Sequence, residues 1–81
     1  MNVFVLLTEV VYDYEVDRRV KVFSTLEKAK REFDKFVKKE KKNAEDEDWT
    51  IELDEMDFEA YPEGTYVEDH VLACIEEQEV L

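Results

Sequence analysis

The 81-residue sequence contains only one glycine, one proline and one cysteine. With Gly64 as its single glycine, the chain cannot form the glycine-rich loops that hold phosphates in P-loop and dinucleotide-binding proteins. With Cys74 as its single cysteine, it cannot form an internal disulfide, so the fold does not need an oxidising compartment. Neither a signal-peptide pattern nor an apolar run of membrane-spanning length is found, and a cytoplasmic location is therefore expected.

Positive charge is missing from the second half of the chain. Residues 1–43 carry 11 basic and 8 acidic side chains, whereas residues 44–81 carry 15 acidic side chains and neither lysine nor arginine. The net charge of −12 therefore arises from the C-terminal half. Such a field attracts positively charged partners and disfavours direct binding of nucleic acid, which needs cations against its phosphates.

Length and apolar content indicate a single domain over residues 1–81. Hydrophobic residues make up 44% of the chain, which is too many for a disordered tail, and 81 residues leave no room for a second core. The segment from Ser24 to Lys42 predicts the only helix, because Ser24 and Glu27 have capping-box spacing and apolar residues then recur at helical spacing. Its lysine-rich face is interleaved with acidic residues, so we interpret it as a solvated surface.

The segments on either side of this helix alternate as β-strands do. Residues 2–14 and 19–23 predict an antiparallel hairpin with a turn at residues 14–17. Residues 49–61 change phase near Asp54, which indicates either a bulge or a break.

After these strands, Pro62, Glu63 and Gly64 predict a turn, and residues 65–76 predict a last strand. The expected fold is α+β in ββαββ order, with a three- to four-stranded, mostly antiparallel sheet and one amphipathic helix on one face.

A single helix can cover only one face of such a sheet. We expect the uncovered face to present Phe4 and Leu6, with Tyr12 and Tyr14 further along the chain. An uncovered apolar face marks self-association or a partner site, so a homodimer through this face is one prediction. The alternative is that the C-terminal hairpin curls over the face.

Catalytic and metal sites are not expected. His70 and Cys74 are the only histidine and cysteine, and four residues along a strand separate them by roughly 13 Å, too far for a nucleophile and its base. We interpret them as an ordinary strand residue and a small core residue. The acidic residues lack the EF-hand spacing with its central glycine, so we predict no metal, no cofactor and no enzymatic activity.

The acidic half predicts a binding surface. Alternate carboxylates on an extended strand stand roughly 6.6 to 6.8 Å apart, and such an array can imitate the phosphates of nucleic acid. The predicted partner is a basic protein surface, most concretely that of a nucleic-acid-binding protein. The alternative is that the acids only keep a small sheet soluble and its edges unpaired. The predicted binding residues are Asp46, Asp48, Glu52, Asp54, Asp57, Glu59, Glu68 and Asp69.

The segments VFVLLTEV, VFST and LEKAKREFDKF, between Val3 and Phe36, resemble a loose group of small uncharacterised bacterial and phage proteins. In that group a hairpin leads into an FSTxEKA-type helix start and then into further strand. The resemblance implies no catalytic residues, and the acidic C-terminal hairpin departs from the group's pattern. In size and charge the chain is also similar to the small acidic inhibitors that phages use against host restriction or CRISPR nucleases.

Together these observations predict a non-catalytic nucleic-acid mimic that inhibits a basic nucleic-acid-binding protein, with phage anti-defence as one setting. The alternative function is a small assembly protein that dimerises through its uncovered sheet face.

Overall fold

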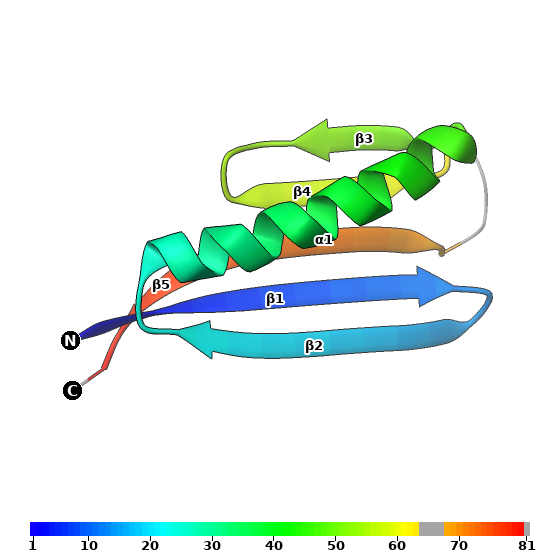
Figure 1. The fold of residues 1–81 in the computed structure, drawn as a ribbon. Coiled ribbons are helices and arrows are strands. Elements are labelled where there is room, and N and C mark those ends of the chain that lie inside the picture. Colours follow the sequence, from blue (N-terminus) through cyan, green and yellow to red (C-terminus); the bar gives the residue numbers. More distant parts are fainter. Residues whose placement is uncertain (64–67, 81) are drawn as a thin grey trace.

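A computed structural model describes residues 1–63 and 68–80 of the chain (Figure 1). Its five strands form one antiparallel sheet in the order β2-β1-β5-β4-β3, and the helix crosses one face of that sheet. The α+β class and the single amphipathic helix agree with the sequence prediction. The expected three to four strands and ββαββ order were wrong, because the described order is ββαβββ. The elements are β1 (Asn2–Tyr12), β2 (Glu15–Phe23), α1 (Leu26–Asp46), β3 (Thr50–Leu53), β4 (Asp57–Tyr61) and β5 (His70–Glu79).

The additional strand arises where the apolar phase changes in residues 49–61. The chain breaks there instead of bulging: the Asp54 carboxylate accepts a hydrogen bond from the Glu55 N–H at 2.8 Å, and the Asp54 N–H donates to the Asp57 carbonyl at 2.7 Å. The resulting turn folds β4 back on β3, with Ile51 opposite Ala60. Opposite residues of an antiparallel pair point to the same face, so Ile51 and Ala60 both face the helix although their positions differ in parity.

The hairpin of β1 and β2 is tighter than the sequence suggested. Asp13 and Tyr14 both have positive φ, 52° and 70°, which is the requirement of a two-residue type I′ turn, and Tyr12 pairs with Glu15. The turn predicted at residues 14–17 therefore lies earlier, and β2 extends to nine residues. At the other predicted turn, Gly64 and the predicted strand residues 65–67 lie outside the described residues.

The helix begins one residue later than expected and continues further. Thr25 is the N-cap, since its Oγ1 accepts a hydrogen bond from the Lys28 N–H at 3.2 Å, whereas Ser24 had been predicted to cap. The C-terminal end is at Asp46, beyond the predicted Lys42, because Ala44 adds another buried position to the apolar stripe.

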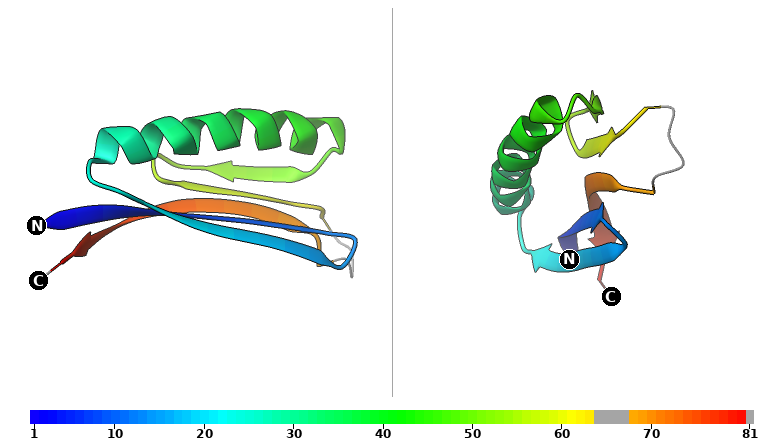
Figure 2. Two further views of the ribbon diagram at one scale, coloured as in Figure 1. Left: turned by 60° about the horizontal axis from the view of Figure 1, so that its bottom comes forward. Right: turned by 90° about the vertical axis from the view of Figure 1, so that its right-hand side faces the viewer.

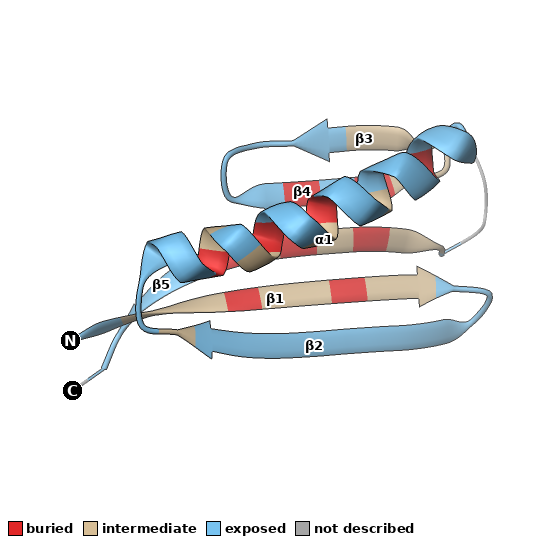
Figure 3. Cartoon of the chain, in the orientation of Figure 1, coloured by how far each residue is buried: buried red, intermediate tan, exposed pale blue. Residues whose placement is uncertain are grey.

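The hydrophobic core lies between α1 and one face of the sheet. Figure 2 shows the helix along that side only, and Figure 3 shows the buried residues concentrated beneath it. Phe33 of α1 and Phe58 of β4 are the largest fully buried side chains, each 2% exposed. Within the described residues, no helix combines the length and apolar character that crossing a membrane requires. The core residues are Leu6, Ala29, Phe33, Val37, Ala44, Phe58, Ala60, Val71, Ala73 and Ile75.

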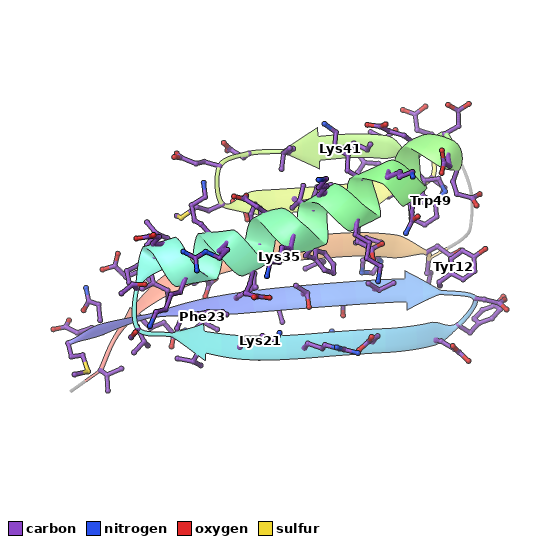
Figure 4. The ribbon with its side chains drawn as sticks, viewed as in Figure 1. Tyr12, Lys21, Phe23, Lys35, Lys41 and Trp49 are labelled. Carbon is purple, nitrogen blue, oxygen red and sulfur yellow. The ribbon has the colours of Figure 1, made fainter. Side chains whose placement is uncertain are left out.

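The two faces of β1 are the reverse of the sequence assignment. Leu6 is 3% exposed in the core and Phe4 packs against the same cluster, so both lie under the helix and are not available for self-association. The register explains this result: Leu6 lies opposite Ile75, another core residue. Tyr12 is an exposed residue at the end of β1, on the same side of the molecule as Trp49 (Figure 4), and Tyr14 lies in the turn.

Candidate protein interface on the open sheet face

The sheet face opposite α1, here called the open face, is covered by no other described element. Its members follow from strand alternation and from the register with the core residues. They are Val3, Val5, Leu7, Glu9 and Val11 of β1, Val16, Arg18, Val20 and Val22 of β2, His70, Leu72, Cys74, Glu76 and Gln78 of β5, Asp57, Glu59 and Tyr61 of β4, and Thr50 and Glu52 of β3.

The open face has an apolar half and an acidic half. Strands β1 and β2 supply the apolar half, and the valines of β2 are about 60% exposed: Val16 62%, Val20 60% and Val22 62%. Strands β3 and β4 and the C-terminal part of β5 supply the acidic half. Its four carboxylates, called here the acidic patch, are Glu52, Asp57, Glu59 and Glu76.

Carboxylates are crowded within the acidic patch. Glu52 and Glu59 are directly opposite each other in the register of β3 and β4, where Cβ atoms lie about 4.5–5.5 Å apart. The Tyr61 hydroxyl donates a hydrogen bond to Glu52 at 3.5 Å. The charge of Glu52 is the main cause that raises the pKa of Tyr61, and Glu59 and Glu63 add to it. The raised pKa reports a concentrated negative potential at this edge of the sheet.

No basic side chain in the described part of the chain forms an ion pair with the acidic patch within 4 Å. Every ion pair found there, within 4 Å, uses a carboxylate from the first half: Glu9, Asp17, Glu27 or Glu32. On the open face, Arg18 is the single lysine or arginine among the described residues, and it is bound to Glu9. The acidic patch is therefore free to attract a cationic group from outside.

Glu9 joins three strands of the open face through a three-residue cluster with Arg18 of β2 and His70 of β5. It is 8% exposed; Arg18 Nε donates to its carboxylate at 2.9 Å, and His70 Nε2 lies 2.8 Å from its other oxygen. His70 Nδ1 lies 3.0 Å from the Glu68 carbonyl oxygen. Both ring nitrogens thus face acceptors, and both can donate only when the imidazole is protonated.

The pKa values of this cluster shift accordingly. The hydrogen bond to Glu9 is the main cause that raises the pKa of His70. Hydrogen bonds from His70 and then from Arg18 lower the pKa of Glu9, despite its burial. Near neutral pH the cluster holds an ionised carboxylate between two donors, so Glu9 contributes little to the field of the acidic patch.

The fold brings together only part of the acidic set predicted from the sequence. Glu52, Asp57 and Glu59 share the open face, whereas Asp54 lies in the turn between β3 and β4. Asp46 and Asp48 lie at the C-terminal end of α1.

Glu68 and Asp69 precede β5, where the Asp69 carboxylate accepts a hydrogen bond from the Asp13 N–H at 3.1 Å. Glu76 is not in the set of binding residues predicted from the sequence, although the structure places it on this surface. Its position beside Asp57 depends on β5 pairing with β4, and the sequence pattern does not specify that pairing.

A shallow hollow of about 670 Å³ lies over the acidic patch and the adjacent part of β5. Burial is the main cause that raises the pKa of Cys74 in this hollow, and the charges of Glu76 and Asp57 raise it further. A thiol with a raised pKa is a poor nucleophile at neutral pH. The hollow therefore combines an apolar floor with negative walls, which suits a long cationic side chain. Its lining residues are Glu52, Leu53, Asp54, Asp57, Phe58, Glu59, Leu72, Ala73 and Cys74.

Among residues 1–63 and 68–80, no group of three or more histidine, cysteine, aspartate or glutamate side chains is placed to hold a metal ion. Comparisons of the chain with protein-family models, with curated proteins and with solved structures find no match.

Proposed function

We propose that the chain is a non-catalytic acidic binding module whose acidic patch docks on the basic surface of a nucleic-acid-binding protein and blocks it as a nucleic-acid mimic. The observation that carries this proposal is the group of four carboxylates, Glu52, Asp57, Glu59 and Glu76, on an open sheet face where none of them forms an ion pair in the described part of the chain. The size and charge of the chain, similar to those of phage inhibitors, support an anti-defence setting for this role.

The spacing of the carboxylates supports mimicry. Asp57 and Glu59 are alternate residues of one strand, about 6.8 Å apart, and Glu59 faces Glu52 across the ladder. A sheet holds the backbone beneath these charges in a fixed array, so this chain loses little backbone conformational entropy when it binds a basic groove. Nucleic acid releases its condensed counterions when a basic surface neutralises its phosphates, and a carboxylate array of similar density allows the same electrostatic gain.

Apolar residues beside the acidic patch supply the centre of the proposed interface. Leu72 and Cys74 lie in the hollow, and Leu7 lies opposite Cys74 on β1. Protein interfaces combine a desolvated apolar centre with a polar rim, and a charged surface alone gives fast association more than affinity. We therefore place the centre of the interface at the hollow and its electrostatic rim at the acidic patch.

The test is capture from host lysate by the immobilised protein, washed at low salt and then at about 0.5 M salt, where the Debye length is well below 10 Å. Three baits are compared. The first is the wild type, and the second neutralises the acidic patch through Glu52→Gln, Asp57→Asn, Glu59→Gln and Glu76→Gln. The third carries the same number of neutralised acids elsewhere, through Glu15→Gln, Glu27→Gln, Asp34→Asn and Glu40→Gln.

We expect the wild type and the third bait to retain one basic nucleic-acid-binding protein that salt or double-stranded DNA releases, and the second bait to lose it. The purified partner should then bind DNA less well when the wild type is present. Equal loss from the second and third baits would show that the contact depends on net charge, and equal retention by all three baits would show that the acidic patch does not carry the contact. Retention that DNA cannot compete would contradict mimicry.

A second candidate function rests on a different observation, the exposed valines of the open face. Such a face is suited to assembly by stacking of two sheets, which buries apolar surface against a second copy. Val5 lies on the interior strand β1, so Val5→Lys places a charge within this face and away from the sheet edges. Stacking predicts a mass that rises with protein concentration, changes little with salt, and returns to the monomer in Val5→Lys.

A further inference from the structure

Strand β2 forms an open edge of the sheet. It pairs with β1 on one side, and no other described strand lies on its other side (Figure 1). Residues 15–22 are all exposed, and the nine-residue strand is extended throughout. Alternate residues of an edge strand direct their N–H and C=O groups outward, which is a template for pairing with a further strand.

Charges along this edge follow a self-complementary pattern. On the helix side of β2 the residues in order are Glu15, Asp17, Arg19 and Lys21, which reads as two negative charges followed by two positive ones. In a second copy that runs antiparallel, the two positive charges come first and the two negative charges follow, so each charge can face one of opposite sign. These side chains are solvent-accessible, with Arg19 70%, Asp17 60% and Lys21 57% exposed (Lys21 in Figure 4).

We propose that two copies of the chain pair antiparallel through their β2 edges, with Arg18 on the two-fold axis, and form one continuous sheet of ten strands. In this register Glu15 lies opposite Lys21 of the second copy, and Asp17 opposite Arg19 of the second copy. On the open face Val16 lies opposite Val20. Opposite charges and paired β-branched residues are the cross-strand neighbours that stabilise antiparallel pairs.

The symmetry and the charges together select this register. In an antiparallel pair, directly opposite side chains point to the same face of the sheet. A two-fold axis therefore places one residue opposite its own copy, and moving the axis by one residue shifts the pairing by two residues. With Arg19 on the axis, Arg19 would face its own copy and only the pairing of Asp17 with Lys21 would remain. With Val20 on the axis, Arg19 would face Lys21.

The arginine on the axis does not oppose the proposed pairing. The Arg18 guanidinium binds the Glu9 carboxylate on β1, with Nε at 2.9 Å, so it points across the sheet and away from the free edge. Its charge is already compensated by a residue that is 8% exposed. In the proposed dimer, each Arg18 is already paired with Glu9 of its own chain, so the two guanidinium groups do not face each other as unpaired charges.

The distribution of charge over the sheet favours β2 over the other edge. The acidic patch lies mainly on β3 and β4, at the end of the strand order opposite to β2. Pairing through β2 keeps the two acidic halves at the far ends of the assembly, where mutual repulsion is smallest. Pairing through β3 would bring Glu52 of both copies together on a strand of only four residues.

The simpler interpretation of a charged edge is protection against edge-to-edge aggregation. It predicts a monomer at every concentration and gives no reason for a self-complementary order of charges. An edge contact of this length is smaller than a standard interface, so the proposed dimer is weak and exchanges rapidly. It leaves both acidic patches accessible, and the dimer is independent of their proposed function.

Sedimentation equilibrium from micromolar to millimolar concentration tests the proposal with three variants. The negative variant carries Arg19→Glu and Lys21→Glu, and the positive variant carries Glu15→Lys and Asp17→Lys. The control carries Lys38→Glu and Lys41→Glu, which makes the same change of charge as the negative variant but on the exposed face of α1.

We expect the wild type and the control to dimerise, and each edge variant alone to dimerise about tenfold more weakly or not at all. An equimolar mixture of the negative and positive variants should form a heterodimer, detected by native mass spectrometry with one partner labelled with ¹⁵N. This recovery also shows that both variants are folded. A wild type that stays monomeric at millimolar concentration would overturn the proposal, as would a mixture that forms no heterodimer.

Discussion

Nε2 of His70 lies 2.8 Å from a carboxylate oxygen of Glu9, a residue 61 positions earlier in the chain. The contact joins the start of β5 to the middle of β1 on the open face, and Arg18 completes it from β2. Three strands are thus linked by charged side chains on a face that has no helix to cover it. The strength of the contact between His70 and Glu9 depends on pH, because it is an ion pair only when His70 is protonated and Glu9 is ionised.

The first prediction concerns that pH dependence. Folding raises the pKa of His70 from its ordinary 6.5, so the protonated ring stabilises the fold below that pH, and the stabilisation is lost as the pH rises through the raised pKa. Folding lowers the pKa of Glu9 from 4.5, so its contribution is present above 4.5 and is lost as the pH falls through the lowered pKa. The contact between His70 and Glu9 should therefore contribute most between pH 4.5 and pH 6.5.

Urea unfolding at about pH 6 and about pH 9 measures this effect in the wild type and in His70→Gln. We expect the wild type to exceed the variant by on the order of 1 kcal/mol at the lower pH and by less at the higher pH, since a third of the His70 side chain faces solvent and weakens the pair. Repulsion among the other acids affects both proteins equally and cancels in the difference. An equal difference at the two pH values would contradict the assignment.

The second prediction concerns the like-charged pair of Glu52 and Glu59. Neutralising either residue, by Glu52→Gln or Glu59→Gln, should raise the free energy of unfolding by about 0.2–1 kcal/mol, because directly opposite like charges destabilise a ladder. The double variant should gain less than the sum of the two. The pKa of Tyr61 should fall in each variant, and ultraviolet titration measures it. Additive gains would show that the two carboxylates do not interact.

The third prediction concerns the start of α1. Thr25→Ala should lower the free energy of unfolding by about 1 kcal/mol, because it leaves the Lys28 N–H without its side-chain acceptor. Ser24→Ala is the matched control and should change stability by less than about 0.5 kcal/mol. Denaturant unfolding of both variants measures the difference, and a larger effect at Ser24 would place the cap one residue earlier.

The fourth prediction concerns Phe33, which is 2% exposed between α1 and the sheet. Phe33→Ala should cost about 3–5 kcal/mol, a large share of the roughly 5–15 kcal/mol typical of a domain. Phe33→Leu should cost less and keep the protein folded for measurement. Tyr14→Ala is the control, because Tyr14 is 97% exposed and should contribute within about 0.5 kcal/mol. Equal losses at the two positions would contradict the assigned core.

Local patterns determined the elements of this protein. The helical spacing of Ala29, Phe33 and Val37 specifies the buried stripe of α1, and the run of β-branched and aromatic residues in residues 2–12 specifies a strand. The phase change near Asp54 showed where regularity ends. These signals are readable from sequence because they depend on neighbours within a few residues.

Long-range pairing decided everything that involves two faces of the sheet. Leu6 and Leu7 are both apolar, and which of them lies under the helix depends on the register with β5, where Leu6 meets Ile75. The sequence assignment of these faces was wrong for that reason. The same register brings His70 to Glu9, a contact that no spacing in the sequence indicates.

The sequence alone determined that the net negative charge arises from the C-terminal half of the chain. Tertiary structure decided which of those charges share a surface, because β4 pairs with β5 and places Asp57 near Glu76, while the turn at Asp54 removes that residue from the strand. Net charge is a sum over residues and can be read from the sequence, whereas the set of charges on one surface depends on which strands are neighbours in the sheet. Strand order is set by burial of the whole apolar set at once, and that is a property of the folded molecule.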